Sequence, residues 1–557
     1  MIPGRQSPAG PYYNHPPVPA TMKKMFLLTA SAFFIAAVSF AQQQTAPVKK
    51  EGWHLLDPAG TGYLGISLDA AYKLLEGRKS TPVIVAVIDS GIDTAHEDLL
   101  SVLWVNTREI PGNGIDDDGN GYVDDIHGWN FCGSKSGENL ARNSHEITRV
   151  YHNWKKEFEG KKESRILADR KYLYGQWKKA AALIEEEYRN AQANLPRLLD
   201  FEKNLRENRR LVEAALGKDD FKAADLPPLA GQGEQVKAAA NTWYNMFDRF
   251  GNPDMAASTV MTDLGGYIGQ LNNAVTRKTT PPEDWRGQLT KDKYEDINDR
   301  SYGNNNLKEG SGDHGTLVSG TIGATRGNGI GMDGIAANVR IMGIRAVPGG
   351  DEHDKDVALA IRYAVDNGAK VINMSFGKPV SPYKKMVDDA VRYAASKNVL
   401  LIHGSGNDGK DITNDIFYPN PVFLEGDTAT NYITVGASGD KSTGAIAAPF
   451  SNYSKKSVDI FAPGMYIYAT ATNNIYKGAD GTSLACPVAT GVAALLFSYF
   501  PALTPQQVKR ILIETGETVN GSVPLPGEAE KSVPFSSLSV SGKIINAADA
   551  VKMAMKE

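Results

Sequence analysis

Residues 83–93 of this 557-residue chain read VIVAVIDSGID. The first five residues are all apolar and mostly β-branched, which is typical of a strand buried on both faces of a sheet. The apolar run ends at Asp89, so that a carboxylate stands where the strand is expected to end. Groups that bind ligands or react gather at the carboxyl ends of strands in open α/β sheets. Asp89 is therefore a candidate functional residue.

Four further apolar runs have the length of a strand, at residues 339–347, 370–376, 399–403 and 432–437. Between them, apolar residues recur every three or four positions, as on one face of a helix. The clearest such segments are residues 357–365 and 387–394, and Gly368 follows the first where a C-terminal cap belongs. Strands that alternate with helices indicate a parallel twisted sheet flanked by helices. We predict an α/β fold.

Composition excludes several classes of protein. The chain is 41% hydrophobic and 22% charged, which is ordinary for a globular protein. Its 60 Lys and Arg against 64 Asp and Glu give a formal net charge of −4, so binding of nucleic acid through bulk basicity is not expected. Two cysteines, Cys132 and Cys486, are too few for a disulfide framework or a CxxC-type metal site.

The N-terminus has the order of features of a secretory signal peptide. Lys23 and Lys24 precede an apolar run at residues 25–40, and Ala41 ends a small-residue cleavage site. A membrane span needs about 20 apolar residues, so this run is short for an anchor. We expect translation to start near Met22 and cleavage to follow residue 41. The product would be secreted or periplasmic, with no membrane span after signal removal; a retained anchor is the alternative.

Two later motifs supply the partners that Asp89 needs for acyl transfer. His314 lies in DHGTLVSGTIGA, and Ser483 lies in GTSLACPVATGVAALL, near the start of an apolar helix. A serine hydroxyl becomes a good nucleophile when imidazole accepts its proton, and a carboxylate orients the imidazole. Asn407 follows the run at residues 399–403, and its amide is a suitable donor to an oxyanion.

Together these motifs resemble those of the subtilisin-like serine peptidases. The order Asp, His, Asn, Ser is that of the family; VIDSGID and HGT are similar to two of its motifs, and residues 481–487 match its GTSxAxP motif. The resemblance covers about residues 53–130 and 292–555. It implies an exported serine endopeptidase acting on proteins or peptides. Ser483 would be its nucleophile, His314 its base, Asp89 the group that orients His314, and Asn407 the oxyanion donor.

The resemblance also implies residues that contact the substrate. The edge-strand motif of the family, which pairs with the substrate backbone, is matched by Ser375, Phe376 and Gly377. The segment that lines the primary pocket in relatives is usually rich in Ala, whereas here it reads Gly404, Ser405 and Gly406. This departure leaves the preferred side chain of that pocket open. Cys486 replaces a common serine, and we expect it to be a buried small residue.

Other interpretations of the same residues stay open. Taken singly, Asp89 could be a strand-end cap, His314 a packed core histidine and Ser483 a helix cap. The whole chain could also be a catalytically silent binding protein built on this fold, or an esterase or amidase that uses the same triad on small substrates.

Residues 112–125, GNGIDDDGNGYVDD, form a second segment whose residue types indicate a chemical role, in this case metal binding. Acidic and amide oxygens that alternate around glycines are typical of calcium loops. The predicted ligands are Asp116, Asp118, Asn120, the Tyr122 carbonyl, Asp124 and Asp125. Position 12 of the loop is His127, where an EF-hand has Glu, so the loop is not a standard one. We expect a structural calcium ion, with a metal-free turn as the alternative.

Another acidic cluster comprises Asp351, Glu352 and Asp354, and we predict that it lies in a solvated loop.

Residues 133–290 interrupt the α/β pattern. The segment at 146–219 is rich in charges of both signs and carries apolar residues at helical spacing, with Pro196 expected to end its first helix. We predict a helical insertion that contains a solvated hairpin and can dock a partner or substrate, and the mixed signs argue against nucleic acid. Residues 42–132 and 291–557 would then be the two parts of one peptidase domain.

Overall fold

The computed structural model describes residues 50–557 except 251, 309–311, 441–442 and 444. The predicted signal peptide at residues 1–41 lies outside the described residues. The described chain divides into two compact units. The smaller unit contains Ala181–Pro281, and the larger contains the described part of Gln43–Ala180 together with Pro282–Glu557.

The larger unit is built on a nine-stranded sheet with the strand order β10-β13-β7-β6-β5-β4-β1-β3-β2. All neighbouring strands are parallel except β10 and β13. The strands are β1 (Val83–Asp89), β2 (Gly128–Asn130), β3 (Val339–Arg345), β4 (Val371–Met374), β5 (Leu400–Gly404), β6 (Tyr432–Ser438), β7 (Ile460–Pro463), β10 (Glu517–Thr518) and β13 (Lys543–Ile544). All five strands predicted from the sequence are confirmed.

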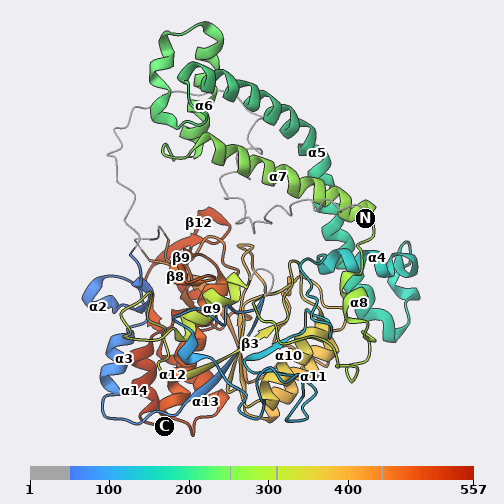
Figure 1. The fold of residues 1–557 in the computed structure, drawn as a ribbon, viewed down its shortest axis with the longest axis vertical. Coiled ribbons are helices and arrows are strands. Elements are labelled where there is room, and N and C mark those ends of the chain that lie inside the picture. The colour runs from blue at the N-terminus through green and yellow to red at the C-terminus, as the bar shows by residue number, and fades with distance from the viewer. Residues whose placement is uncertain (1–49, 251, 309–311, 441–442, 444) are drawn as a thin grey trace. The chain divides into compact units, whose positions relative to one another are not determined.

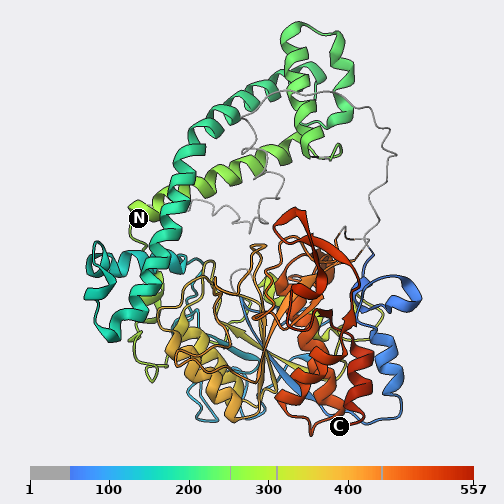
Figure 2. The same cartoon turned by 180° about the vertical axis from the view of Figure 1, so that it is seen from behind.

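Strand side chains alternate between two apolar cores, one on each face of the sheet. In β1, Val83, Val85 and Val87 belong to one core, and Ala86 and Ile88 to the other. The first face is covered by α3 (Leu68–Leu74), α9 (Asp313–Gly323), α12 (Thr482–Tyr499), α13 (Pro505–Thr515) and α14 (Ala547–Ala554), and the second by α10 (Asp354–Asp366) and α11 (Lys384–Ser396) (Figures 1 and 2). The predicted α/β fold with helices on both faces is confirmed.

Helix α12 is the most deeply buried helix of the first face, and this burial accounts for its composition. Its residues from Leu484 to Ser498 are all buried. In the part of the chain that the structure describes, α12 is the one helix long and apolar enough to cross a membrane. Because it packs inside the larger unit, its apolar surface is already covered by protein.

Smaller elements complete the larger unit. Two antiparallel hairpins are formed by β8 (Ile467–Ala471) with β9 (Ile475–Ala479), and by β11 (Ser522–Leu525) with β12 (Glu528–Pro534). The remaining helices of this unit are α2 (Pro58–Thr61), α4 (Glu146–Phe158) and α8 (Trp285–Thr290). Residues 133–180 and 282–290 of the predicted insertion therefore belong to the larger unit.

The smaller unit has a core of its own, formed by α5 (Lys171–Leu216), α6 (Glu234–Phe250) and α7 (Ala257–Thr279). Four residues of α5 are buried there at seven-residue intervals: Ala191, Leu198, Leu205 and Val212. Such spacing places them along one face of the helix. They pack with apolar residues of α6 and α7, among them Trp243, Phe247 and Leu264.

The predicted helix end at Pro196 is wrong, because α5 continues through it. A proline inside a helix removes one backbone donor and costs about 3 kcal/mol. Burial of Leu198 and Leu205 beyond the proline, on the same face as Ala191, offsets that cost.

The antiparallel partner of α5 is α7. Arg277 lies 2.8 Å from Glu187, and Lys278 pairs with Glu185. These two pairs place the first part of α5 within the smaller unit beside the last turn of α7.

The prediction of a solvated loop at Asp351, Glu352 and Asp354 is wrong. Glu352 and Asp354 are 2% and 1% exposed. Arg149 of α4 donates to the backbone carbonyls of Asp351 and Glu352, and Lys378 Nζ lies 2.8 Å from Asp354 Oδ1. Asp354 is thus paired with a cation, whereas burial raises the pKa of Glu352 to about 8, which favours its neutral form. Both cations are distant in the sequence, so the local acidic run gave no sign of them.

Candidate active site

Asp89 and His314 come together although 225 residues separate them. Asp89 is the last residue of β1, and His314 is the second residue of α9. His314 Nδ1 lies 2.7 Å from Asp89 Oδ1, which also accepts a hydrogen bond from the Ser90 backbone at 2.7 Å. A carboxylate only accepts, so Nδ1 carries the proton and Nε2 of the neutral ring is an acceptor.

A glycine allows α9 to approach β1 this closely. A Cβ on Gly315 would lie 1.9 Å from the Gly91 carbonyl oxygen and 3.2 Å from the Cβ of Asp89. No side chain fits there, which explains why glycine follows His314 in the HGT motif.

Opposing effects act on the pKa of His314. Burial alone would lower the pKa, because the charged ring is poorly solvated, but the Asp89 carboxylate raises it through its charge and its hydrogen bond, and Asp313 adds to this. The net pKa is raised above the usual 6.5. The His314 side chain is 34% exposed and that of Asp89 only 3%. The arrangement suits a base that solvent can reach, supported by a shielded carboxylate.

Ser483 and Asn407 face a common space at the N-terminus of α12. A Cβ on Gly481 would lie 2.7 Å from Ser483 Oγ and 3.7 Å from Asn407 Nδ2. Asn407 Oδ1 accepts hydrogen bonds from the Thr482 backbone at 2.9 Å and from its hydroxyl at 3.0 Å. Because these bonds turn the amide oxygen toward Thr482, Nδ2 is left on the side of Ser483. The helix N-terminus adds partial positive charge at this point.

A chain of hydrogen bonds ties the end of β4 to the first turns of α12. Ser375 Oγ donates to the Ser483 carbonyl at 2.9 Å, and Asn373 Nδ2 donates to Ser375 Oγ at 2.9 Å. Asn373 Oδ1 accepts from Cys486 Sγ at 3.2 Å and from Thr490 Oγ1 at 2.9 Å. Cys486 is fully buried, as predicted, and burial raises the pKa of its thiol to about 12. It is therefore a structural donor.

The segments that follow β4 and β5 lie next to each other and next to α12. His403 Nε2 donates to the Phe376 carbonyl at 2.7 Å, and burial lowers the pKa of His403 to about 4, which keeps the ring neutral. On the β5 side, the Gly406 N–H donates to Thr482 Oγ1 at 3.1 Å, and a Cβ on Gly404 would meet the Thr482 carbonyl at 3.0 Å. The structure thus brings both groups of predicted substrate-contacting residues to α12.

Sequence reasoning missed Asn452, which holds the β5 segment. Its Nδ2 donates to the Ser405 carbonyl at 3.0 Å, and its Oδ1 accepts from the backbone of Asp408 at 3.1 Å and of Lys410 at 3.0 Å. The residues bonded to Asn452 lie on both sides of Asn407 in the sequence. Asn452 lies in an ordinary SNYS stretch, so no local signal could have identified it.

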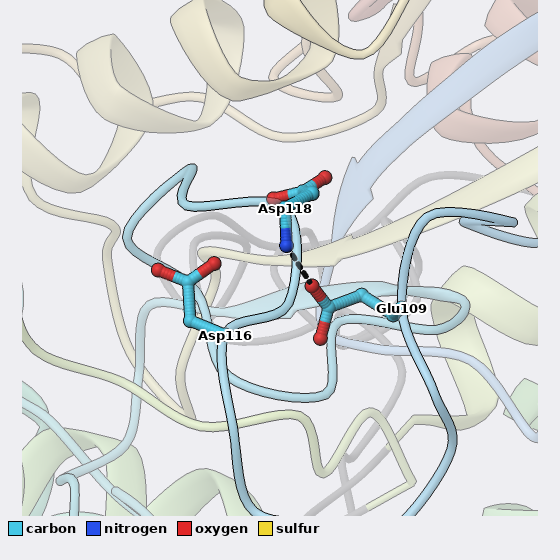
Figure 3. Close-up of side chains that lie close together, drawn as sticks. All are labelled: Glu109, Asp116 and Asp118. Atoms are coloured by element: carbon cyan, nitrogen blue, oxygen red, sulfur yellow. Dashed lines mark hydrogen bonds between the residues drawn. The ribbon is translucent and has the colours of Figure 1, made fainter.

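The acidic loop gathers a set of carboxylates that differs from the predicted one. Figure 3 shows Glu109, Asp116 and Asp118 together; each offers an oxygen, and these oxygens all lie within 4.8 Å of one another. Glu109 was not predicted. It also accepts hydrogen bonds from the backbone of Asp118 at 3.1 Å and of Asp124 at 3.0 Å. Three carboxylates this close form a set of hard oxygen ligands that fits a calcium ion.

All of these side chains take part in the folding of the loop. Asp116 accepts from the backbone of Asn120 at 3.0 Å and of Gly121 at 2.8 Å, and Asp118 is paired with Arg108 at 2.9 Å. Asp124 accepts from the backbone of Gly112 and Gly114, and Asp125 accepts from Asn106 at 2.7 Å and from the Tyr363 hydroxyl at 2.6 Å. Burial raises the pKa of Asp125 to about 6. The predicted set also included Asn120, whose Oδ1 accepts from the Tyr122 backbone and whose Nδ2 donates to Asp125.

The chain is similar in sequence to known proteins. The sequence profile described as the Subtilase family matches residues 80–525. The Thermophilic serine proteinase of Bacillus sp. (strain AK1) is 35% identical over 210 residues, which cover 38% of this chain and 48% of that protein. The Cell wall-associated protease of Bacillus subtilis (strain 168) is 35% identical over 229 residues, 41% of this chain and 24% of that protein.

A third relative is matched over more of its length. Subtilisin DY of Bacillus licheniformis is 32% identical over 216 residues, which cover 38% of this chain and 73% of that protein. The match therefore spans about half or less of the first two relatives and nearly three quarters of the third.

Replacement of Asp89 by Asn should lower the pKa of His314. The amide keeps the shape of the side chain but removes the negative charge that raises the pKa, so the pKa of His314 falls. The measurement is an NMR titration of ¹³C-labelled histidine, with His314→Gln to assign the signal. Asp313→Asn is the matched control and should give a smaller fall. An unchanged pKa in Asp89→Asn would show that the two groups are not coupled.

Proposed function

The chain belongs to the subtilase family, and from that premise we propose that it is an exported serine endopeptidase that hydrolyses peptide bonds in proteins or peptides. The observation that carries this proposal is the 2.7 Å hydrogen bond between His314 and Asp89. It holds the His314 imidazole in the tautomer that a general base requires. Asp89 ends β1, which pairs with β4, and Ser375 just after β4 is bonded to the Ser483 carbonyl.

Ser483, His314 and Asp89 act as a catalytic triad in this proposal. Ser483 Oγ attacks the carbonyl carbon of the scissile bond while His314 Nε2 accepts the hydroxyl proton. Asp89 stabilises the imidazolium that results. His314 then gives the proton to the leaving amine, and a water molecule hydrolyses the acyl-enzyme with His314 again acting as base.

Asn407 Nδ2 and the Ser483 backbone N–H stabilise the oxyanion. Support comes from the orientation of the Asn407 amide, whose oxygen is bonded to Thr482. Removal of one such donor typically lowers turnover by about 100- to 1,000-fold. The positive end of α12 acts in the same direction.

The substrate backbone binds as an added strand along Ser375, Phe376 and Gly377. The segment of Gly404, Ser405 and Gly406 borders the opposite side of the attacked residue. Export rests on the predicted signal peptide at residues 1–41.

Glu109, Asp116 and Asp118 hold a structural calcium ion. Asp118 is already paired with Arg108 at 2.9 Å, and the ion would add positive charge beside all three carboxylates and fix the loop that precedes β2. The motivation is the convergence of the three side chains (Figure 3).

The smaller unit controls access of large substrates or docks a partner, and contributes nothing to the chemical step. Its separate core and its charged helix surfaces support this assignment. The residues proposed for catalysis all belong to the larger unit.

Ser483→Ala should abolish both hydrolysis of casein and covalent labelling by a fluorophosphonate probe, because the nucleophile is lost. Ser396→Ala removes an exposed serine of α11 and should behave like the unaltered protein. Labelling at full level in Ser483→Ala would refute the nucleophile assignment. Labelling of the unaltered protein without casein hydrolysis would indicate an esterase or amidase, and absence of labelling a silent binding protein.

Removal of calcium by a chelator should lower the unfolding temperature, because an ion bound only to the folded state stabilises that state by mass action. Asp116→Ala combined with Asp118→Ala should abolish the effect. Asp389→Ala removes a carboxylate on α11 whose side chain is 44% exposed; it is the control and should keep the effect of the chelator. If the double variant responds to chelator as the unaltered protein does, the ion is bound elsewhere.

Replacement of residues 188–276 by a short Gly/Ser linker should leave hydrolysis of a small chromogenic peptide within a few-fold and change cleavage of casein much more. The variant retains the Glu187–Arg277 and Glu185–Lys278 pairs, which bring α5 and α7 together, because these four residues lie outside the replaced range. Circular dichroism and the unfolding temperature establish that the variant is folded. Equal effects on the small and large substrates would eliminate a role in substrate access.

A further inference from the structure

We propose that Phe417 fills the space beside Ser483 that receives the side chain of the attacked residue, called P1 here, so that the protein cleaves after small residues such as Gly, Ala and Ser. The inference rests on the proposed function and specifies the substrate class of the same site.

The space is defined by two adjacent parallel strands. β4 and β5 are paired, with Met374 opposite His403. Beyond this pair the chain continues to Gly377 on one side and to Gly406 on the other. Ser375 is bonded to the Ser483 carbonyl, and the Gly406 N–H to the Thr482 hydroxyl, so both segments border the nucleophile. A peptide carbonyl that Ser483 attacks, with its oxygen at Asn407, must place the neighbouring P1 side chain between them.

The ring of Phe417 lies between these same two segments. A Cβ built on Gly377 would be 2.3 Å and 2.6 Å from Cε1 and Cζ of Phe417, and a Cβ built on Gly406 would be 3.3 Å from each of the same two atoms. The tip of one ring therefore contacts both walls. Glycines on two facing walls would leave a wide slot for a substrate side chain. Here the Phe417 ring takes the space at Gly377 and borders the space at Gly406, where Asn452 Nδ2 lies closest, at 2.4 Å from the built Cβ.

Backbone and ring contacts hold Phe417 in place. The next residue, Tyr418, forms an antiparallel bridge to Lys378, with N–H to carbonyl distances of 2.9 Å and 3.0 Å. The His403 ring lies 5.9 Å from the Phe417 ring, between centroids. His403 is itself bonded to the Phe376 carbonyl. Phe417 is thus tied to both walls of the space.

The first turns of α5 support the same segment from the outside of the site. Lys179 Nζ donates to the Ile416 carbonyl at 2.9 Å and lies 2.7 Å from Asp415 Oδ1. Gln176 donates to the Tyr418 hydroxyl at 3.1 Å and accepts from the Ser381 backbone at 2.9 Å. These two side chains flank Phe417, and both belong to a helix that continues without interruption into the smaller unit. Gln176 and Lys179 are positioning residues for Phe417.

A smaller residue at position 417 opens the space for a large P1 side chain. In the unaltered protein, kcat/KM for an Ala-Ala-Pro-Ala p-nitroanilide should exceed that for Ala-Ala-Pro-Phe by at least about 10-fold. Phe417→Ala should raise kcat/KM for the Phe substrate by at least about 10-fold and change that for the Ala substrate by no more than a few-fold. Phe417→Leu keeps more of the core contact and should give an intermediate result. Ile416→Ala, an exposed neighbour, is the matched control and should keep the original preference.

A binding measurement separates this inference from the proposed function. In the Ser483→Ala background, calorimetry with acetylated Ala-Ala-Pro-Ala and Ala-Ala-Pro-Phe amides reports the P1 preference without any catalysis. Tighter binding of the Ala peptide, with gain of Phe binding in Phe417→Ala, supports the inference even if the protein proves inactive. Equal or better acceptance of Phe by the protein with Phe417 intact, or no change of preference in Phe417→Ala and Phe417→Leu, would overturn it.

The role of α5 has its own readout. Lys179→Ala combined with Gln176→Ala should lower the ratio of kcat/KM for the Ala over the Phe substrate, because the ring is less firmly held. Lys178→Ala removes a neighbouring lysine that lies 3.9 Å from Glu163 and should leave the ratio unchanged. A merely structural contribution would lower both values of kcat/KM together, and that result would contradict the positioning role.

Discussion

The parallel pairing of β1, β4 and β5 brings three strand ends to one edge of the sheet, and the candidate site depends on this constraint. β1 ends in Asp89, β4 leads to Ser375 and β5 leads to Asn407. Helix α12 then meets the same edge, because its apolar surface can be buried only against the first face of the sheet. Any change that shifted β4 or β5 would move the support of Ser483 and the orientation of Asn407 together.

Electrostatic pairing inside the larger unit depends on residues that are far apart in the sequence. Asp89 is matched to His314 across 225 residues. Lys378, immediately after the segment proposed to bind substrate, is buried with carboxylates of α4 and α10, Glu146 and Asp354. Helix α4 lies in the segment that interrupts the sequence pattern, but its charges complete this buried network. The interruption is therefore partly built into the body of the larger unit, and residues 181–281 form the separate part.

Helix α5 contributes residues to both compact units. Its first turns bind the segment that carries Phe417, and its later turns provide the heptad-spaced face of the smaller core. Pro196 lies within α5, and burial on both sides of that residue keeps the helix whole.

The amino-acid sequence by itself determined five of the nine strands of the sheet, the helices at residues 357–365 and 387–394, and the motifs around Asp89, His314, Asn407 and Ser483. These features depend on local periodicity and on residue types at short spacing. Only the tertiary structure decided which distant groups meet. Glu109 joins Asp116 and Asp118, and Asn452 holds the segment before Asn407. Arg149 and Lys378 contact an acidic run that the sequence alone predicts to be solvated. Phe417 likewise lies in an unremarkable stretch and reaches Gly377 and Gly406 only in the folded chain. The physical reason is that hydrogen bonds, ion pairs and van der Waals contacts act over a few ångströms in space, whatever the separation of the residues along the chain.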